Sequence, residues 1–405
     1  MIKITGFIHR EALHDLIGRW MLDRFEASDP TALLQLVHFN SVYVARYLPL
    51  LAEGLLQGVH GGRITRRTCF TKGDLKDQLV AYLPDASERA TRLVAGYRVD
   101  PGRFYRETPF RGTAYFTGSE GQRRYVGSSR IKRIRRLAEK SARKVVDWLY
   151  EEILRRARSD PRLPESDATI GGLVGPLRPD LAHDPARAID SLEAHGRALL
   201  HRLRAMPAPG WPHDVEINDV AGIKVVIAPD AEARLSEILR GLGCRPVERE
   251  VHRGDYSAVN LLVDFHPDKD RILAQGLPEK VVRIFGAHGI TPWETRRRFE
   301  TFVRSGEPAV RVEIICSDPA ETLESEIGRC MHEDRIIRQR LGRAYQGQLS
   351  QNLEFLLEYL FALPAAPEAR LDRLPVRLWE RYLPDYFDEV KRTLFRVPSV
   401  ELDPE

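Results

Sequence analysis

The sequence predicts an α+β fold in which a mixed β-sheet is flanked by helices and preceded by a helical and β-hairpin region. Three observations predict it. Apolar residues recur at helical spacing from Arg10 to about Arg46. Two short runs, 113–116 and 123–126, flank a turn-rich segment and are typical of a β-hairpin. After Asp219 the chain reads strand, helix, strand, strand, strand, helix, an order that packs helices against a mixed sheet.

The composition is that of a globular protein with room for two or three domains. The chain has 405 residues, of which 43% are hydrophobic and 30% charged. The sequence shows neither a signal peptide nor an apolar stretch long enough to span a membrane. Its 4 cysteines are scattered without a CxxC pair, which argues against a zinc site and against a disulfide framework. We therefore expect a cytoplasmic protein without a membrane partner.

The chain divides into four expected segments. Residues 1–158 form the helical and hairpin region, which ends in a long basic helix from Ser128 to about Arg156. Residues 159–189 are rich in Pro, Gly and Asp and are expected to be a linker or insertion. Residues 190–362 hold the strand and helix pattern, and 363–405 form a proline-rich tail.

The elements after Asp219 are indicated one by one. Residues 222–227 form an apolar strand, and 229–242 form a helix that Gly243 ends. Alternating apolar residues predict strands over 259–265 and 310–314. Asp318 and Pro319 are typical of a helix cap and first helical position. The arginine-rich segment 266–308 is ambiguous.

Two acidic residues stand at strands in this region. Asp219 precedes the first strand, and Glu313 lies on the charged face of a later one. If the two strands are neighbours, both carboxylates reach one end or face of the sheet, where such a pair can hold Mg²⁺ with a nucleotide. The alternative is structural, with salt bridges from Asp219 to Lys224 and from Glu313 to Arg311.

Three blocks in this region resemble a known family. DVAGIKVVI (219–227) is similar to an Asp-x-x-Gly-x-Arg strand entry, and DYSAVN (255–260) to Gly-Tyr-Arg-Ser-x-His. EIICSDPAETLESEIGRCMH (313–332) is similar to Glu-Val-Gln-Ile-Arg-Thr followed by a helix reading Ala-Glu-x-Gly-x-Ala-x-His. These three patterns are those of the synthetase domain of the RelA/SpoT family of (p)ppGpp (alarmone) synthetases, which this region therefore resembles. The resemblance implies a nucleotidyltransferase-like fold.

The resemblance has both matches and departures. Glu326, Gly328 and His332 stand in register with the family's helix. At five positions the family has an arginine, histidine or glutamine that would contact substrate, and this chain has another residue. These residues are Lys224, Ser257, Asn260, Ile315 and Ser317. Charge-assisted contacts of this kind contribute strongly to phosphate recognition. The departures therefore leave open a different substrate or a catalytically inactive regulatory homologue.

The resemblance implies a Mg²⁺-dependent pyrophosphokinase with ATP as donor and a guanosine nucleotide as acceptor. Asp219 and Glu313 would hold Mg²⁺, and Glu313 would also accept the proton of the guanosine 3′-hydroxyl as its oxygen attacks the β-phosphate of ATP. Tyr256 would stack on the guanine, unless it is an ordinary core aromatic. Lys224 and Asn260 would complete the substrate contacts.

The family also places cations for phosphate on a helix before the first block. The run SRIKRIRRLAEKSARK (129–144) offers Arg130, Lys132 and Lys140 at the family's mutual spacing, but unusually far from Asp219. The run HGRALLHRLR (195–204) is closer in sequence and has a poorer motif, with its cations at Arg197, Arg202 and Arg204. The sequence leaves both runs open.

A second hypothesis is an RNA-binding or tRNA-modifying protein on the same scaffold. Its support is the region 103–144, where ten arginine and lysine residues between 103 and 136 interleave with six aromatic residues. Cations beside aromatic faces are typical of single-stranded RNA binding. A hairpin core with a solvated arginine rim explains the same pattern. The sequence indicates no oligomeric state.

Overall fold

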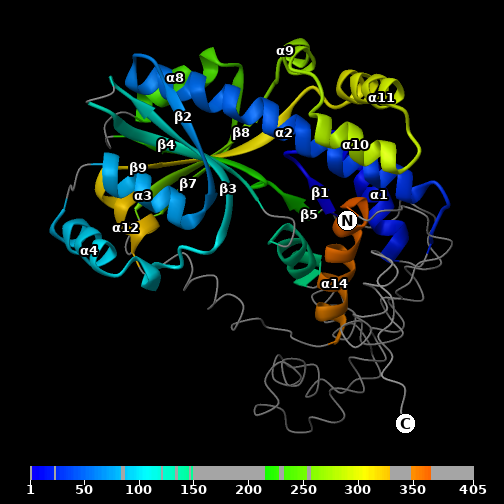
Figure 1. Cartoon of the computed structure of the whole chain (residues 1–405), viewed down its shortest axis with the longest axis horizontal. Helices are drawn as coiled ribbons and strands as arrows, with labels where there is room; N and C mark the ends of the chain where they lie inside the picture. Colours follow the sequence, from blue (N-terminus) through cyan, green and yellow to red (C-terminus); the bar gives the residue numbers. More distant parts are fainter. Residues whose placement is uncertain are drawn as a thin grey trace, which may run out of the picture.

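A seven-stranded sheet forms the centre of the protein (Figure 1). The computed structural model describes residues 2–21, 24–83, 87–119, 122–132, 136–145, 147–148, 215–227, 232–252, 257–328 and 348–365. The strands follow the order β2 (Thr65–Thr71), β3 (Pro109–Thr117), β4 (Arg124–Ile131), β6 (Ala221–Val226), β9 (Val310–Ser317), β8 (Ala258–Phe265) and β7 (Cys244–His252). Only the β6–β9 pair is parallel within this sheet, so the sheet is mixed. The α+β class with helices on a mixed sheet is confirmed.

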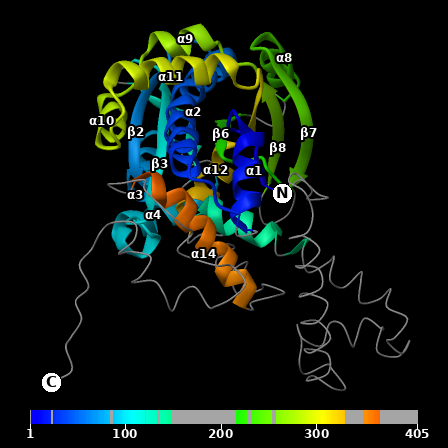
Figure 2. The same cartoon turned by 90° about the vertical axis from the view of Figure 1, so that its right-hand side faces the viewer.

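Helices cover both faces of the sheet (Figures 1 and 2). The long helix α2 (Asp29–His60) packs on β3, β4 and β6 from one side. On the other side lie α3 (Lys72–Tyr82), α4 (Glu88–Val99) and α12 (Pro319–Ile327). Strand β6 shows the division, because Ile223 and Val225 belong to the large core with α2 whereas Val226 packs in the smaller core with α3, α4 and α12. This alternation is what a strand buried on both faces requires.

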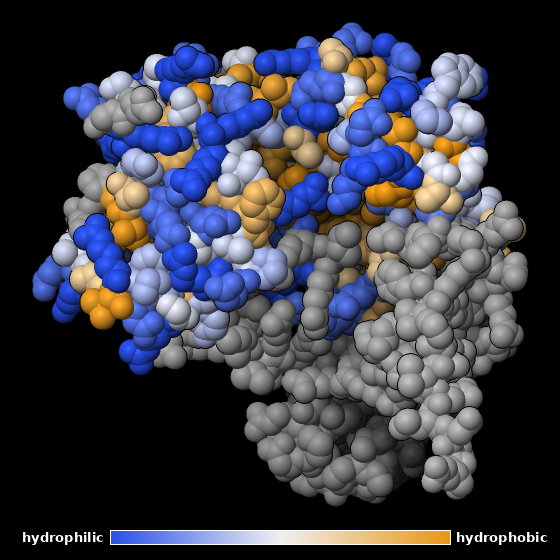
Figure 3. All heavy atoms as spheres, in the orientation of Figure 1, coloured by the Kyte–Doolittle hydropathy of each residue, from blue (hydrophilic) through white to orange (hydrophobic). Residues whose placement is uncertain are grey.

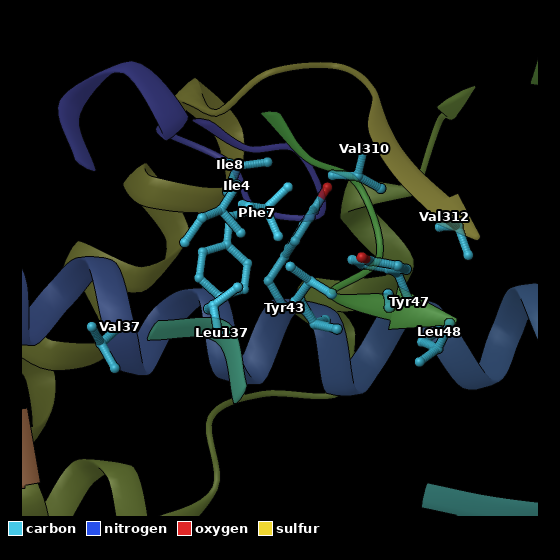
Figure 4. Packing of buried hydrophobic residues seen from close by; sticks show 14 of the residues in the cluster. Ile4, Phe7, Ile8, Val37, Tyr43, Tyr47, Leu48, Leu137, Val310 and Val312 are labelled. Atoms are coloured by element: carbon cyan, nitrogen blue, oxygen red, sulfur yellow. The ribbon is translucent and has the colours of Figure 1, made fainter. Parts of the chain in front are cut away.

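The N-terminal segment is part of the large core. Strand β1 (Ile2–Ile4) pairs in parallel with β5 (Val215–Ile217) in a separate two-stranded sheet. The next segment leads into helix α1 (Arg10–Met21). Figure 4 shows the contact of this segment with α2 and β9 through the buried side chains of Ile4, Phe7, Ile8, Tyr43, Tyr47, Val310 and Val312.

The two helices predicted between Arg10 and Arg46 are present as α1 and α2, but α2 extends to His60. It passes through Pro49 without ending, because its apolar face stays buried on both sides of that residue. Helix α2 is closed at Gly61, which has a positive φ of 70° that a residue with a Cβ rarely adopts.

The predicted β-hairpin is confirmed as β3 and β4, but the prediction of a helix starting at Ser128 is wrong. Residues 128–131 continue β4 and pair with β6, with Ser128 opposite Lys224 and Ile131 opposite Ala221. Among the described residues after β4, 136–145 and 147–148 are helical. Ser128 and Ser129 are small residues buried in the sheet. The basic residues that follow them do not show the apolar alternation that would indicate a strand, so the sequence did not predict it.

Three short helices occupy the ambiguous segment 266–308. They are α9 (Lys269–Ala274), α10 (Glu279–Ala287) and α11 (Pro292–Ser305). Asp268 and Thr291 cap α9 and α11 through their side chains. The other described elements are α8 (Glu232–Gly241), α14 (Gln348–Ala362) and the 3₁₀ turns η1 (Pro101–Phe104) and η4 (Leu363–Ala365).

The expected linker, 159–189, lies outside the described residues. Strands from before it (β2, β3 and β4) and after it (β6 to β9) share one sheet. None of the helices that the structure describes is long and apolar enough to cross a membrane.

Candidate functional site

Three neighbouring strands bring one acid, one glycine and one arginine side by side. In the β6–β9 ladder Gly222 is opposite Glu313, and in the β4–β6 ladder Gly222 is opposite Arg130. A Cβ on Gly222 would lie 3.5 Å from Glu313 Oε2 and 3.7 Å from Arg130 Nε. A larger side chain would fill the space between the two charged groups. The glycine of the first sequence block therefore keeps this space open.

Glu313 is paired only loosely. Arg130 Nη2 lies 3.8 Å from Glu313 Oε2, which is an ion pair but too long for a hydrogen bond. The Glu313 side chain is 16% exposed, and Oε2 is buried without a hydrogen-bond partner among the described residues. A buried carboxylate oxygen without a donor costs free energy unless a ligand or ion satisfies it.

Asp219 lies just before β6 and binds two lysines. Its Oδ2 accepts a hydrogen bond from Lys140 Nζ at 2.7 Å and another from Lys132 Nζ. The backbone N–H of Lys132 also donates to Val220 O at 2.7 Å, which fixes the end of β4 beside the entry to β6. The second oxygen, Asp219 Oδ1, is buried and has no hydrogen-bond partner in the described part of the chain.

Burial and the contacts between the charged groups shift the pKa values of Asp219 and Lys132. Burial opposes ionisation of Asp219, but the charges of Lys132 and Lys140 outweigh it and hold the pKa of the carboxyl well below its usual range. Burial lowers the pKa of Lys132 to about 8, although Asp219 offsets part of the effect. Asp219 is therefore a carboxylate that both lysine side chains contact.

The first run of cations contacts the predicted acids. Arg130 contacts Glu313, and Lys132 and Lys140 contact Asp219, across a sequence separation of 79 residues for the Lys140 pair. The competing run with Arg197, Arg202 and Arg204 lies outside the described residues.

Lys224 belongs to a second buried ion cluster. Its Nζ donates to Glu326 Oε1, and Lys72 Nζ donates to Glu326 Oε2 at 3.1 Å. The Glu326 side chain is only 7% exposed. The alternative salt bridge from Asp219 to Lys224 is not formed, because Lys224 points to the face of the sheet where α12 carries Glu326.

The other alternative salt bridge, from Glu313 to Arg311, is also not formed. Arg311 instead contacts Asp264, its opposite residue on β8, with Nε 3.0 Å from Oδ1. It also donates to Glu216 Oε2 at 2.8 Å. The guanidinium of Arg311 is therefore engaged by Asp264 and Glu216, and Glu313 instead forms its ion pair with Arg130.

A small cavity lies between Arg130 and the Lys224–Glu326 ion pair. It has a volume of about 10 Å³, room for about one water molecule, and its wall includes Arg130, Gly222, Lys224, Ile315 and Glu326. Ile315 stands where the RelA/SpoT pattern has glutamine. Its apolar side chain, 7% exposed, offers no hydrogen bond to a substrate here.

Two other departures from the family pattern are engaged within the protein. Asn260 Nδ2 lies 3.1 Å from His252 Nε2, and Ser317 Oγ lies 2.9 Å from Thr322 Oγ1. Asn260 Oδ1 is buried without a hydrogen-bond partner among the residues described. Tyr256, the expected guanine-stacking residue, and His332 lie outside the described residues.

The two predicted acids are chemically suited to Mg²⁺. Asp219 Oδ1 and Glu313 Oε2 are buried carboxylate oxygens without hydrogen-bond donors in the described chain, and carboxylate oxygens are the ligands Mg²⁺ prefers. The described residues hold no cluster of three or more His, Cys, Asp or Glu side chains that could bind a metal alone. Mg²⁺ commonly uses one or two carboxylates together with substrate phosphates and water, which these residues fit.

Sequence reasoning missed Lys72 as a member of this site. Lys72 is the first residue of α3, directly after the N-cap Thr71. The capping box formed by Thr71 and Asp74 is visible in the sequence as TKGD and could have located the start of α3. Nothing in the sequence pattern indicates that this helix start reaches Glu326.

Comparisons with family models, curated proteins and solved structures found no match to this chain. The resemblance to the RelA/SpoT family therefore stays a prediction from the residues.

Proposed function

We propose that the protein is a Mg²⁺-dependent pyrophosphokinase of the RelA/SpoT type, with ATP as the donor and a guanosine nucleotide as the acceptor. The observation that supports it most is the convergence of Arg130, Lys132 and Lys140 on Glu313 and Asp219. These five residues were selected by their likeness to the family's blocks, and they come from two segments far apart in the chain. A purely structural set of charges need not combine the phosphate-binding and acidic positions in this way.

Glu313 has the role of general base in this proposal. Its Oε2 accepts no hydrogen bond from a described residue, so one carboxylate oxygen can hold Mg²⁺ while the other accepts the proton of an attacking hydroxyl. Arg130 Nη2 lies 3.8 Å from Oε2, too far to use that oxygen in a hydrogen bond. The hydroxyl oxygen gains nucleophilic character as its proton moves to Glu313.

The lysines have the role of orienting phosphate. Lys132 and Lys140 both donate to one oxygen of Asp219. Phosphate oxygens compete with Asp219 for these donors, and fixed donors stabilise charge as it develops during transfer. Mg²⁺, when bound by Asp219 and Glu313, supplies charge neutralisation for the phosphates.

The test is transfer of label from γ-³²P-ATP in the presence of Mg²⁺ to GDP, GTP, ADP or bulk tRNA. We expect label on a guanosine nucleotide with the unaltered protein. Asp219→Asn and Glu313→Gln should each lower the rate by about 10²-fold or more, because each removes charge needed in the transition state. Glu300→Gln is the matched control, since Glu300 is exposed on α11. Equal rates in all three variants would contradict the proposal.

The other hypotheses predict different outcomes of the same assay. RNA modification predicts label on tRNA alone, and an inactive regulatory homologue predicts no transfer to any acceptor. The RNA hypothesis has lost part of its support, because four of its aromatic rings are buried in the cores, namely those of Phe110, Tyr115, Phe116 and Tyr125. Bases cannot stack on these rings without rearrangement of the sheet.

A further inference from the structure

A groove separate from the candidate site runs between α2 and α10. Its volume is about 510 Å³, within the usual range for small-molecule sites. Val42 and Ala45 of α2 and Val281 and Ile284 of α10 give it an apolar lining. Figure 3 shows the surface hollowed between these two helices, with hydrophobic residues in the hollow and hydrophilic residues around it.

Three cations from three different elements line the same groove. They are Arg46 of α2, Arg111 of β3 and Lys280 of α10. No carboxylate among the described residues forms an ion pair with any of them. Arg46 donates to the backbone oxygens of Gln275 and Gly276, and Arg111 to Ser41 Oγ at 3.2 Å.

Burial disfavours positive charge at two residues that line the groove, Arg111 and His38. Burial lowers the pKa of Arg111, with no compensating acid. Burial also lowers the pKa of His38, and the nearby charge of Lys280 acts in the same direction. A set of cations without counter-charge beside an apolar lining favours a ligand that is negative at one end and apolar or planar at the other.

We propose that this groove binds a small organic phosphate of the size of a nucleotide. Its phosphates would contact Arg46, Arg111 and Lys280, and its base and sugar would cover the apolar lining. Three converging cations match several phosphate charges better than one carboxylate. The groove lies on the α2 side of the sheet, whereas Arg130 and Glu313 face α3 and α12, so this proposal does not depend on the proposed function.

Hydrogen exchange of the full chain, titrated with ATP in EDTA, tests the proposal by location. We expect ATP to slow exchange in α10 (Glu279–Ala287). Lys280→Glu and Arg111→Glu should each weaken this effect about tenfold or more in apparent Kd. Arg283→Glu is the matched control, because Arg283 is exposed on the same helix, outside the groove lining, and changes the net charge equally.

Three outcomes would overturn the proposal. One is the absence of any slowing in α10 at millimolar ATP. Another is equal weakening by Lys280→Glu and Arg283→Glu, which would indicate diffuse electrostatic attraction. The third is tripolyphosphate binding as tightly as ATP, since that anion has no body to cover Val42, Ala45, Val281 and Ile284.

Discussion

Glu326 carries a buried charge that depends on two lysines. Its two oxygens accept hydrogen bonds from Lys72 and Lys224, and all three side chains are at most 13% exposed. Glu326→Ala would leave both ammonium groups buried without this partner. We expect a loss of about 3 kcal/mol or more in the free energy of unfolding, measured by urea denaturation.

An exposed ion pair provides the comparison for Glu326. Glu300 and Arg304 lie one helical turn apart on α11, and both side chains are more than half exposed. Glu300→Ala should change the free energy of unfolding by less than about 0.5 kcal/mol. Similar losses in the two variants would show that the Lys72–Glu326–Lys224 cluster is not a tightly coupled buried group.

His60, at the end of α2, makes stability depend on pH. Burial, together with Arg124, lowers its pKa from 6.5 to about 4, and its Nε2 is buried without a hydrogen-bond partner among the described residues. Between these two pH values the unfolded chain binds more protons at this residue than the folded protein does. Its contribution to stability is therefore complete above pH 6.5 and is lost as the pH falls toward 4.

The measurement is the Tm from pH 7.5 to pH 4.5, for the protein and for His60→Gln. We expect the Tm of the variant to fall less steeply with acidification, because glutamine does not titrate. Parallel curves for the two proteins would mean that His60 has the same pKa in the folded and unfolded states.

The choice between the two basic runs could not be made from the sequence. The resemblance to the RelA/SpoT blocks suggested Asp219, Glu313 and the triplet Arg130, Lys132 and Lys140 as candidates. Which cations reach Asp219 depends on how β4 pairs with β6, and that pairing joins residues almost a hundred positions apart. Local sequence patterns do not show which distant strands pair with each other.

At the scale of elements, close approach of β4 to β6 depends on Gly127. A Cβ there would lie 2.4 Å from Lys224 O and 2.9 Å from Leu56 Cδ2 of α2. Because the first of these atoms belongs to the backbone of β6, the strands would have to separate. We expect Gly127→Ala to lower the free energy of unfolding by about 2 kcal/mol or more, measured by urea denaturation.

A glycine in an open position gives the opposite expectation. A Cβ on Gly286, which lies in α10, would have no other atom within 4 Å. Gly286→Ala should raise the free energy of unfolding by about 0.5–1 kcal/mol, since alanine favours the helix. Equal effects at Gly127 and Gly286 would contradict the close approach of β4 and β6.

Elements with strong local patterns were predicted, and elements without them were not. Strands β6, β8 and β9 have regular apolar residues, and α12 has the Asp318 cap. Strand β7 has exposed side chains along almost its whole length, and β2 has one buried residue, Cys69. Neither therefore shows the alternation that identifies a half-buried strand. Helices α9 to α11 were not predicted because each is short and buries at most four residues, which lie among many charged ones.

At the scale of the whole molecule, the central sheet is built from both halves of the chain. The β4–β6 ladder joins them through five residue pairs, from Gly127↔Val225 to Ile131↔Ala221. Helix α2, from the first half, packs on β4 and also on β6 and α8 from the second. The candidate site lies across the same junction, with Arg130, Lys132 and Lys140 from one half and Asp219 and Glu313 from the other.

This arrangement predicts how fragments behave. Residues 1–158 lack β6, the partner of β4, and residues 190–405 lack α2, whose removal exposes Ile223 and Val225. We expect neither fragment alone to unfold cooperatively in calorimetry, because each exposes a large apolar face. Co-expressed fragments should form a complex with a cooperative transition. Cooperative unfolding of 190–405 alone would instead mean that β6 to β9 and their helices are an independent domain, and that the N-terminal cations are additions to a site complete without them.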